Sequence, residues 1–125
     1  MKGDTPLQIA LEKEYLEMAL LLVVDERTNL NVTFKTGWSP LHLAASTGNE
    51  TLVRLLLSDP GICVNAQNHR GWTPLHQAVC KGSAAVARIL LSDERSDVNA
   101  GPPYHRPALH IAVENGNSAL VQLLL

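Results

Sequence analysis

The chain has 125 residues, of which 46% are hydrophobic and 18% are charged, and its formal net charge is −2 at pH 7. This length fits one compact domain, and the hydrophobic fraction is too high for a disordered chain. Ten basic residues against twelve acidic ones argue against a nucleic-acid binder, which is usually basic. Two cysteines are too few for a disulfide framework, and no apolar run is long enough to span a membrane. We therefore expect an intracellular protein of the cytoplasm or nucleus.

The main feature of the sequence is an internal repeat of constant length. Equivalent leucines, alanines and glycines recur every 34 residues, and no insertion or deletion changes this step. The positions that carry the period are Leu7, Leu41, Leu75 and Leu109, Ala10, Ala44, Ala78 and Ala112, and Gly48, Gly82 and Gly116. A fixed period of this size indicates a stack of similar short units.

Each unit has the same order of helix, turn, helix and loop. A pair such as Ser39-Pro40 favours a helix start, because the hydroxyl can cap the helix and proline is tolerated in the first turn. Gly48 can end that helix in the left-handed backbone conformation. A second helix, a loop and an extended segment such as Val64-Asn65-Ala66 then follow. The helices expected from this pattern span residues 6–13, 16–23, 40–47, 50–57, 74–81, 84–91, 108–115 and 118–124.

These motifs resemble the ankyrin repeat family over essentially the whole chain. The residues that carry the resemblance are Thr73-Pro74-Leu75-His76, Gly82, Ile89-Leu90-Leu91 and Val98-Asn99-Ala100, with close copies in the other units. The resemblance implies an all-α helical solenoid with protruding hairpin-like loops. We expect one domain over residues 1–125, made of repeats at about 1–34, 35–68, 69–102 and 103–125, the last one truncated.

The terminal units depart from the pattern. In the first unit, Gln8 replaces the histidine and Glu14 replaces the helix-ending glycine, which costs roughly 1 kcal/mol in a left-handed conformation. In the fourth unit, Pro107-Ala108 replaces Thr-Pro, and His105 stands where earlier units have glycine. The chain stops at Leu125 within a unit, so we expect either a longer array or an open apolar face.

The repeated histidines do not predict a metal or catalytic site. His42, His76 and His110 fall one helix-packing distance apart, about 8–10 Å, whereas a metal needs each ligand at about 2 Å. We interpret them as ties between loop and helix through backbone hydrogen bonds. Cys63 and Cys80 are interpreted as small, partly buried hydrophobic residues, with a reactive thiol as the alternative. No metal, no cofactor and no catalytic residues are therefore expected.

A partner is expected on the concave face that the resemblance implies, formed by the loop tips and the exposed edge of the first helices. The partner-binding candidates are Lys35, Trp38, His69, Arg70, Trp72, Lys81, Tyr104 and Arg106. Trp, Tyr and Arg often anchor interfaces. The alternative is that each tryptophan only packs against the neighbouring loop. The basic residues on this face favour a partner with an acidic segment.

The function predicted is a non-catalytic protein–protein interaction module, monomeric or part of a larger chain. One alternative is an inhibitory masking subunit, because the fourth unit resembles a late repeat of the ankyrin-type inhibitors of Rel-family transcription factors. A nucleic-acid binder or an enzyme is the remote alternative, since neither a long basic stripe nor a catalytic constellation is visible.

Overall fold

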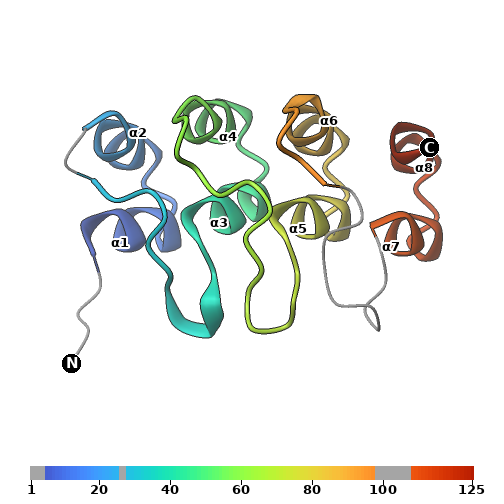
Figure 1. Ribbon diagram of the computed structural model, residues 1–125, viewed down its shortest axis with the longest axis horizontal. Helices are drawn as coiled ribbons and strands as arrows, with labels where there is room; N and C mark the ends of the chain where they lie inside the picture. The colour runs from blue at the N-terminus through green and yellow to red at the C-terminus, as the bar shows by residue number, and fades with distance from the viewer. Residues whose placement is uncertain (1–4, 26–27, 98–107) are drawn as a thin grey trace.

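The computed structural model describes residues 5–25, 28–97 and 108–125. Within these residues the chain forms a helical solenoid with eight α-helices and no strand (Figure 1). Every helix end lies within one residue of the sequence-based prediction, and one short 3₁₀ helix, η1, was not predicted. The helices are α1 (Pro6–Glu12), α2 (Leu16–Val24), η1 (Lys35–Gly37), α3 (Pro40–Thr47), α4 (Glu50–Leu57), α5 (Pro74–Cys80), α6 (Ala84–Ser92), α7 (Ala108–Glu114) and α8 (Ser118–Leu124).

The helices stack in two rows. The odd-numbered helices form one row and the even-numbered helices form the other, and the loops before α3 and α5 project beyond the odd-numbered row (Figure 1). Each helix contacts the next helix in its own row as well as its partner in the other row. We call each pair of helices, with the loop that precedes it, a unit and number the units 1 to 4 along the chain.

Polar side chains cap the N-termini of the helices. The Ser39 hydroxyl accepts a hydrogen bond from the His42 amide at 3.2 Å, and Thr73 does the same for His76 at 3.3 Å. This confirms the role predicted for the Ser/Thr-Pro pairs. The second helices are capped by side chains that the sequence analysis did not single out. Asn49 accepts from the Leu52 amide at 2.9 Å, and Asn117 accepts from the Leu120 amide at 3.1 Å.

The turn between the two helices of a unit needs one left-handed residue. Gly48, Gly82 and Gly116 adopt φ values of 76°, 75° and 68°. In unit 1 the same position is Glu14, and its φ of 58° confirms that a non-glycine residue is held there. Because left-handed backbone is unfavourable for a residue with a Cβ, this turn strains unit 1 relative to the others.

The core is continuous along the stack and consists mainly of leucine, valine and alanine. Leu41, Ala44 and Val53 are completely buried, and Leu75 and Ala78 are buried as well. These side chains lie between units rather than within one pair of helices, because helices of 7 to 9 residues cannot enclose a core alone.

His42 ties unit 2 to unit 3. Its Nε2 donates to the Trp72 carbonyl oxygen at 2.7 Å, and its Nδ1 accepts from the Ser39 amide at 3.1 Å. Because a carbonyl oxygen only accepts, these two contacts together require the neutral imidazole. The tie predicted for His42 is therefore confirmed. His110 is exposed, and residues 98–107 lie outside the described part of the chain.

In the two described loops between helix pairs, an asparagine ties one loop to the next. Asn31 donates to the Gly61 carbonyl at 2.7 Å and accepts from the Cys63 amide at 2.9 Å. Asn65 makes the equivalent pair of contacts with the Arg95 carbonyl at 2.7 Å and the Asp97 amide at 2.8 Å. Val64 and Asn65 form a turn, so the extended conformation predicted there is wrong. The turn aims the amide side chain of Asn65 at the next loop.

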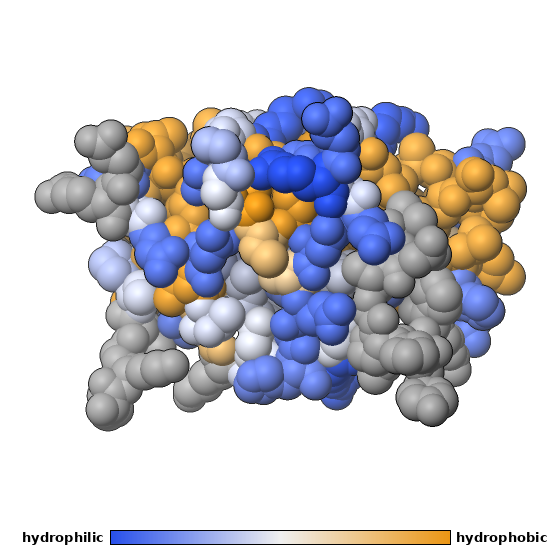
Figure 2. Space-filling model, in the orientation of Figure 1, coloured by the Kyte–Doolittle hydropathy of each residue, from blue (hydrophilic) through white to orange (hydrophobic). Residues whose placement is uncertain are grey.

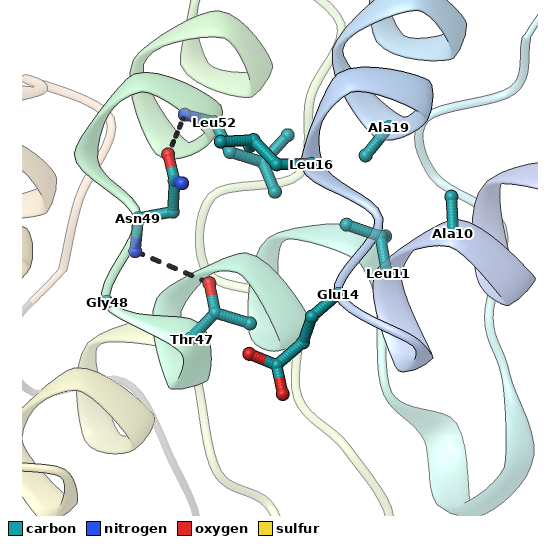
Figure 3. Close-up of a pocket in the computed structure, with 9 residues that line it drawn as sticks. All are labelled: Ala10, Leu11, Glu14, Leu16, Ala19, Thr47, Gly48, Asn49 and Leu52. Atoms are coloured by element: carbon teal, nitrogen blue, oxygen red, sulfur yellow. Dashed lines mark hydrogen bonds between the residues drawn. The ribbon is translucent and has the colours of Figure 1, made fainter.

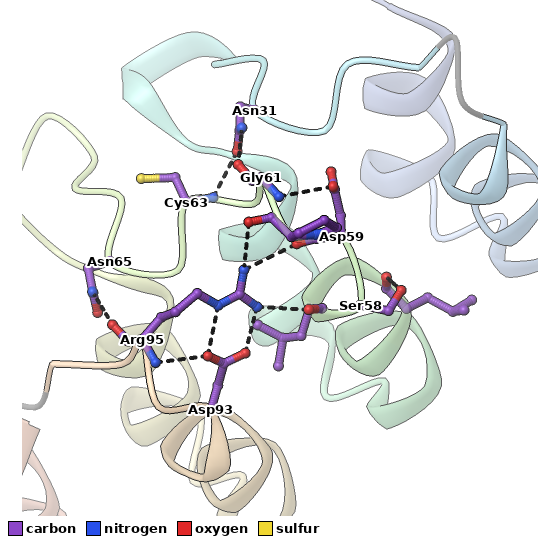
Figure 4. A network of polar contacts seen from close by, with 11 residues as sticks. Asn31, Ser58, Asp59, Gly61, Cys63, Asn65, Asp93 and Arg95 are labelled. Carbon is purple, nitrogen blue, oxygen red and sulfur yellow. Dashed lines mark hydrogen bonds and ion pairs between the residues drawn. The ribbon is translucent and has the colours of Figure 1, made fainter.

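Arg95, in the loop that follows α6, closes the C-terminal end of α4 (Figure 4). Its guanidinium donates to the carbonyl oxygens of Leu57 at 2.8 Å, Asp59 at 3.1 Å and Pro60 at 3.3 Å. Asp93 holds it through contacts of 2.9 Å to Nε and 2.6 Å to Nη2. These hydrogen bonds lower the pKa of the Asp93 carboxyl below its ordinary value. The carbonyls at a helix C-terminus otherwise lack partners, so Arg95 acts as a cap.

The conformation of Gly82 predicts a contrast between two substitutions. Space is available for a side chain, because the nearest atom to an added Cβ is Asn117 Nδ2 at 3.8 Å. Gly82→Val should therefore destabilise the chain by roughly 1–2 kcal/mol through backbone conformation alone. Gly82→Asn should cost clearly less, since asparagine tolerates left-handed backbone. Urea unfolding of both variants checks this, and equal midpoints for the two would contradict it.

His42 predicts a pH-dependent stability. Burial lowers its pKa, the hydrogen bond to Trp72 raises it in part, and the charge of His76 lowers it further. The unfolded chain then binds a proton near the ordinary value of 6.5 while the folded chain does not. The stabilisation is present above that pH and is lost as the pH falls through the lower folded pKa.

The free energy of unfolding should therefore decrease between about pH 7 and pH 5. His42→Gln is the matched control, because Gln8 already occupies this position in unit 1. Thermal unfolding across this range should show a flatter pH dependence for the variant. An unchanged slope would assign the effect to another group.

The contacts of Arg95 predict that its stabilising effect depends on the shape of the guanidinium as well as on its charge. Arg95→Ala should lower the stability by about 1 kcal/mol, a modest value because 35% of the side chain is exposed. Arg95→Lys keeps the charge but lacks the planar fork that reaches Asp93 and the carbonyls together. We expect Arg95→Lys to recover less than half of the loss in urea unfolding. Full recovery would mean that the charge alone stabilises the loop.

Candidate binding surface

The two described projecting loops, before α3 and before α5, are closed hairpin-like turns with the same hydrogen bonds. In the first, the Phe34 amide donates to the Trp38 carbonyl at 2.7 Å, and the Gly37 amide donates to the Phe34 carbonyl at 3.1 Å. In the second, Asn68 donates to the Trp72 carbonyl at 3.0 Å, and Gly71 donates to Asn68 at 2.9 Å. Each loop therefore has a fixed backbone conformation. We use the term loop face for these loop tips together with the exposed edge of α1, α3, α5 and α7.

Neighbouring loop tips are bound to each other. The His69 amide donates to the Thr36 carbonyl at 2.8 Å. A Cβ placed on Gly37 would lie 2.6 Å from Cδ2 of His69, and the φ of Gly37 is 78°. Only glycine lacks the Cβ that would clash with His69 and also adopts this φ without strain. Gly37 therefore lets the two tips come together. The spacing of the residues on these tips is thereby fixed.

The tryptophans pack inward and keep part of their surface exposed. The Trp38 ring lies 5.9 Å from the His42 ring, and Trp72 lies at the same distance from His76. Both tryptophans are half-buried and pack against the core. The packing role considered for them is thus observed. A role as interface anchors stays a prediction.

The structure describes some of the other partner-binding candidates and not the rest. His69, Arg70 and Lys81 are exposed and belong to unit 3. Tyr104 and Arg106 lie outside the described residues, as does the side chain of Lys35. Figure 2 shows that the loop side of the molecule is largely hydrophilic, while apolar surface gathers at the two ends of the stack.

A hollow of about 280 Å³ adjoins Trp38 on this face. It is lined by Glu12, Phe34, Thr36, Trp38 and Leu43. Glu12 was not among the predicted site residues, although the 34-residue step makes it equivalent to Ser46, Cys80 and Glu114. The loop face is therefore acidic beside Trp38 and basic in unit 3.

A second hollow lies between units 1 and 2, beside the turn that joins α1 to α2 (Figure 3). Its volume is about 220 Å³, and its lining residues include Glu14, Leu16, Thr47 and Asn49. Thr47 and Asn49 are engaged locally, because the Asn49 amide donates to the Thr47 hydroxyl and Asn49 caps α4. Glu14 is the one ionisable group in this lining, which offers no acid–base pair.

Both cysteines differ from the sequence-based prediction. Cys63 and Cys80 are exposed and unpaired, so the expectation that they are partly buried is wrong. Cys80 ends α5 on its outer edge, and Cys63 lies in a loop whose backbone bonds to Asn31. The 34-residue period places no constraint on either side chain, because the equivalent residues differ between units.

The described part of the chain gives no sign of a metal centre or a membrane segment. No group of three or more histidine, cysteine or acidic side chains within it could hold a metal ion. None of the helices in the described ranges combines the length and apolar character needed to cross a membrane.

Comparison with known proteins agrees with the repeat architecture. A family model described as ankyrin repeats (3 copies) matches residues 1–68 and 62–125. No curated protein matches the sequence significantly. The family match covers the whole length of the chain, and the structure repeats the same helix pair in each unit. The chain therefore belongs to the ankyrin repeat family.

Proposed function

We propose that the chain binds a protein partner through the loop face and catalyses no reaction. Ankyrin repeats are generally protein–protein interaction modules. The observation that supports this choice of face is the bond between loop tips, from the His69 amide to the Thr36 carbonyl. It holds the exposed edges of Trp38 and Trp72 at a fixed separation without any ligand. Binding to such a preorganised surface loses little conformational entropy.

The charge of the surface indicates the chemistry of the partner. Arg70 and Lys81 are exposed in unit 3, and the half-buried Trp72 lies between them in the sequence. We propose that an acidic segment of the partner meets these cations and that an apolar side chain meets a tryptophan. The cations would mainly raise the association rate, since exposed charges act over distance and are screened by salt.

The state of the thiols supports an intracellular location. Cys63 and Cys80 are the two cysteines of the chain, and both are exposed and unpaired. Exposed free thiols persist in a reducing compartment. We propose the cytoplasm or nucleus.

Charge reversal tests the loop face. Peptides selected from a random displayed library against the unmodified chain serve as the probe, and we expect them to be enriched in acidic residues around an apolar one. Arg70→Glu/Lys81→Glu should slow their association by about tenfold at low salt and leave dissociation nearly unchanged. Raising the salt should reduce the difference between this variant and the unmodified chain.

The matched control reverses two cations elsewhere. Arg54 and Arg88 are exposed on the second helices α4 and α6. Arg54→Glu/Arg88→Glu makes the same change in net charge and should leave peptide association close to that of the unmodified chain. If this pair proved the sensitive one, or if the selected peptides were basic, the loop face would not be the binding surface.

A further inference from the structure

The outer side of α2 is apolar where the other units are polar. Every residue of α2 except Glu17 is apolar, and a helix that is apolar on all sides is typically covered on all sides. Yet Leu16 is 40% exposed, Val24 is 64% exposed, and Leu20, one turn from each, is only half-buried. Residues four apart lie on one face of a helix, so these three form a continuous stripe, which we call the outer stripe.

The repeat shows that neighbouring units do not cover these positions. The equivalent residues in units 2 and 3 are polar and exposed although a unit lies on each side of them: Arg54 and Arg88 for Leu20, and Ser58 and Ser92 for Val24. A further repeat before unit 1 would therefore leave the outer stripe open. Met18 and Leu21 differ in this respect, because their equivalents Leu52 and Ile89 are buried, and they are not part of the stripe.

A hollow continues the outer stripe at the end where Leu16 lies. It is the hollow of about 220 Å³ between units 1 and 2, and Leu16 lines it together with Ala19 and Leu52 (Figure 3). Since its walls come from two units of this chain, the hollow does not depend on what precedes or follows the sequence. An occupant that lies along the outer stripe can therefore place one apolar side chain in this hollow.

Carboxylates surround the same end of the outer stripe. Glu14 lines the hollow, Glu17 follows Leu16 in α2, and Glu50 takes the position of Leu16 in α4. All three are exposed, and none of them forms an ion pair with another side chain in the described part of the chain. Arg54 lies one turn further along α4, so the acidic region is limited to this end. Charge complementarity favours an occupant with a basic residue here.

The shape and charge of the outer stripe fit a helix better than other occupants. Its side chains span two helical turns, roughly 12 Å, and a second helix presents apolar side chains at the same spacing. A peptide in strand form needs a sheet edge, and the described residues form no strand. Anionic lipid would repel the exposed carboxylates. A second copy of the chain offers polar outer sides on α4 and α6, or a stripe with the same carboxylates beside it.

We propose that the outer stripe binds an amphipathic helix of a partner protein. The apolar side chains of that helix cover Leu16, Leu20 and Val24, and a lysine or arginine lies near Glu17 and Glu50. The stripe belongs to the row of even-numbered helices, whereas the loop face lies on the side of the odd-numbered row (Figure 1). The two surfaces are therefore separate, and the chain can bind two partners at once.

The outer side of unit 2 supplies a matched variant for the test. Leu16→Glu/Leu20→Arg/Val24→Ser gives α2 the residues that α4 has at these positions and leaves the net charge unchanged. Helical peptides are selected from a displayed random library on the unmodified chain, with counter-selection on this variant. We expect the selected peptides to carry apolar residues three and four positions apart and a basic residue at one end. Glu17→Gln/Glu50→Gln should weaken their binding by about tenfold at low salt and by less at high salt.

Controls separate this binding from unfolding and from binding at the loop face. The matched variant should stay folded in circular dichroism and thermal unfolding, because α4 carries the same residues at equivalent positions. Leu16→Glu/Val24→Ser keeps the half-buried Leu20 and replaces the matched variant if that one unfolds. Arg70→Glu/Lys81→Glu should not change the binding of these peptides. Failure of the loop face and failure of the outer stripe are thus separate results.

Three results would overturn the proposal. If no peptide survives the counter-selection, or if the survivors are acidic or are not helical when bound, the stripe does not bind a basic amphipathic helix. Self-association of the unmodified chain in sedimentation velocity, lost in the matched variant, would assign the stripe to a second copy. Co-sedimentation with vesicles that contain phosphatidylserine, lost in the same variant, would assign it to a membrane surface.

Discussion

Burial of each helix pair by the next is the interaction on which the rest of the structure depends. Helices of 7 to 9 residues are too short to be stable in isolation. Val53 is completely buried, and its helix α4 contacts α2 and α6 of the neighbouring units. The hairpin loops are in turn held by the helices they precede, so the position of every exposed residue on them follows from the stacking.

Hydrogen bonds between units fix the register of this stack on two sides. On the loop side, His42 reaches the Trp72 carbonyl at 2.7 Å. On the far side, Asn65 bonds to the backbone around Arg95, and Arg95 caps the end of α4. Apolar packing alone tolerates small shifts between helices, whereas directional bonds on both sides of the stack do not. The loop tips are consequently held at a constant separation, which a preorganised binding surface requires.

The sequence predicted the helices because similar helix-starting and helix-ending residues recur at the same positions along the repeat. Ser39, Thr73 and Gly82 each have a defined local role, and even Glu14 adopts the left-handed conformation that its position in the repeat implies. The long-range contacts could not be predicted in this way. A period of 34 shows that Asn31 and Asn65 are equivalent, but it does not show which atoms they meet. The exposure of Cys63 and Cys80 escaped prediction because neither residue belongs to the repeated pattern.

The same comparison between units separates the residues that fold the chain from those available for recognition. At the position of Leu7 every unit has leucine, and three of the four are buried. At the position of Glu12 the units have glutamate, serine, cysteine and glutamate, and this edge of the first helix is wholly or partly exposed. Stacking constrains the first position and leaves the second free, since an exposed side chain at a helix edge contributes little to stability. The loop tips and first-helix edges can therefore differ from unit to unit without disturbing the core, and any specificity for one partner must come from these differing positions.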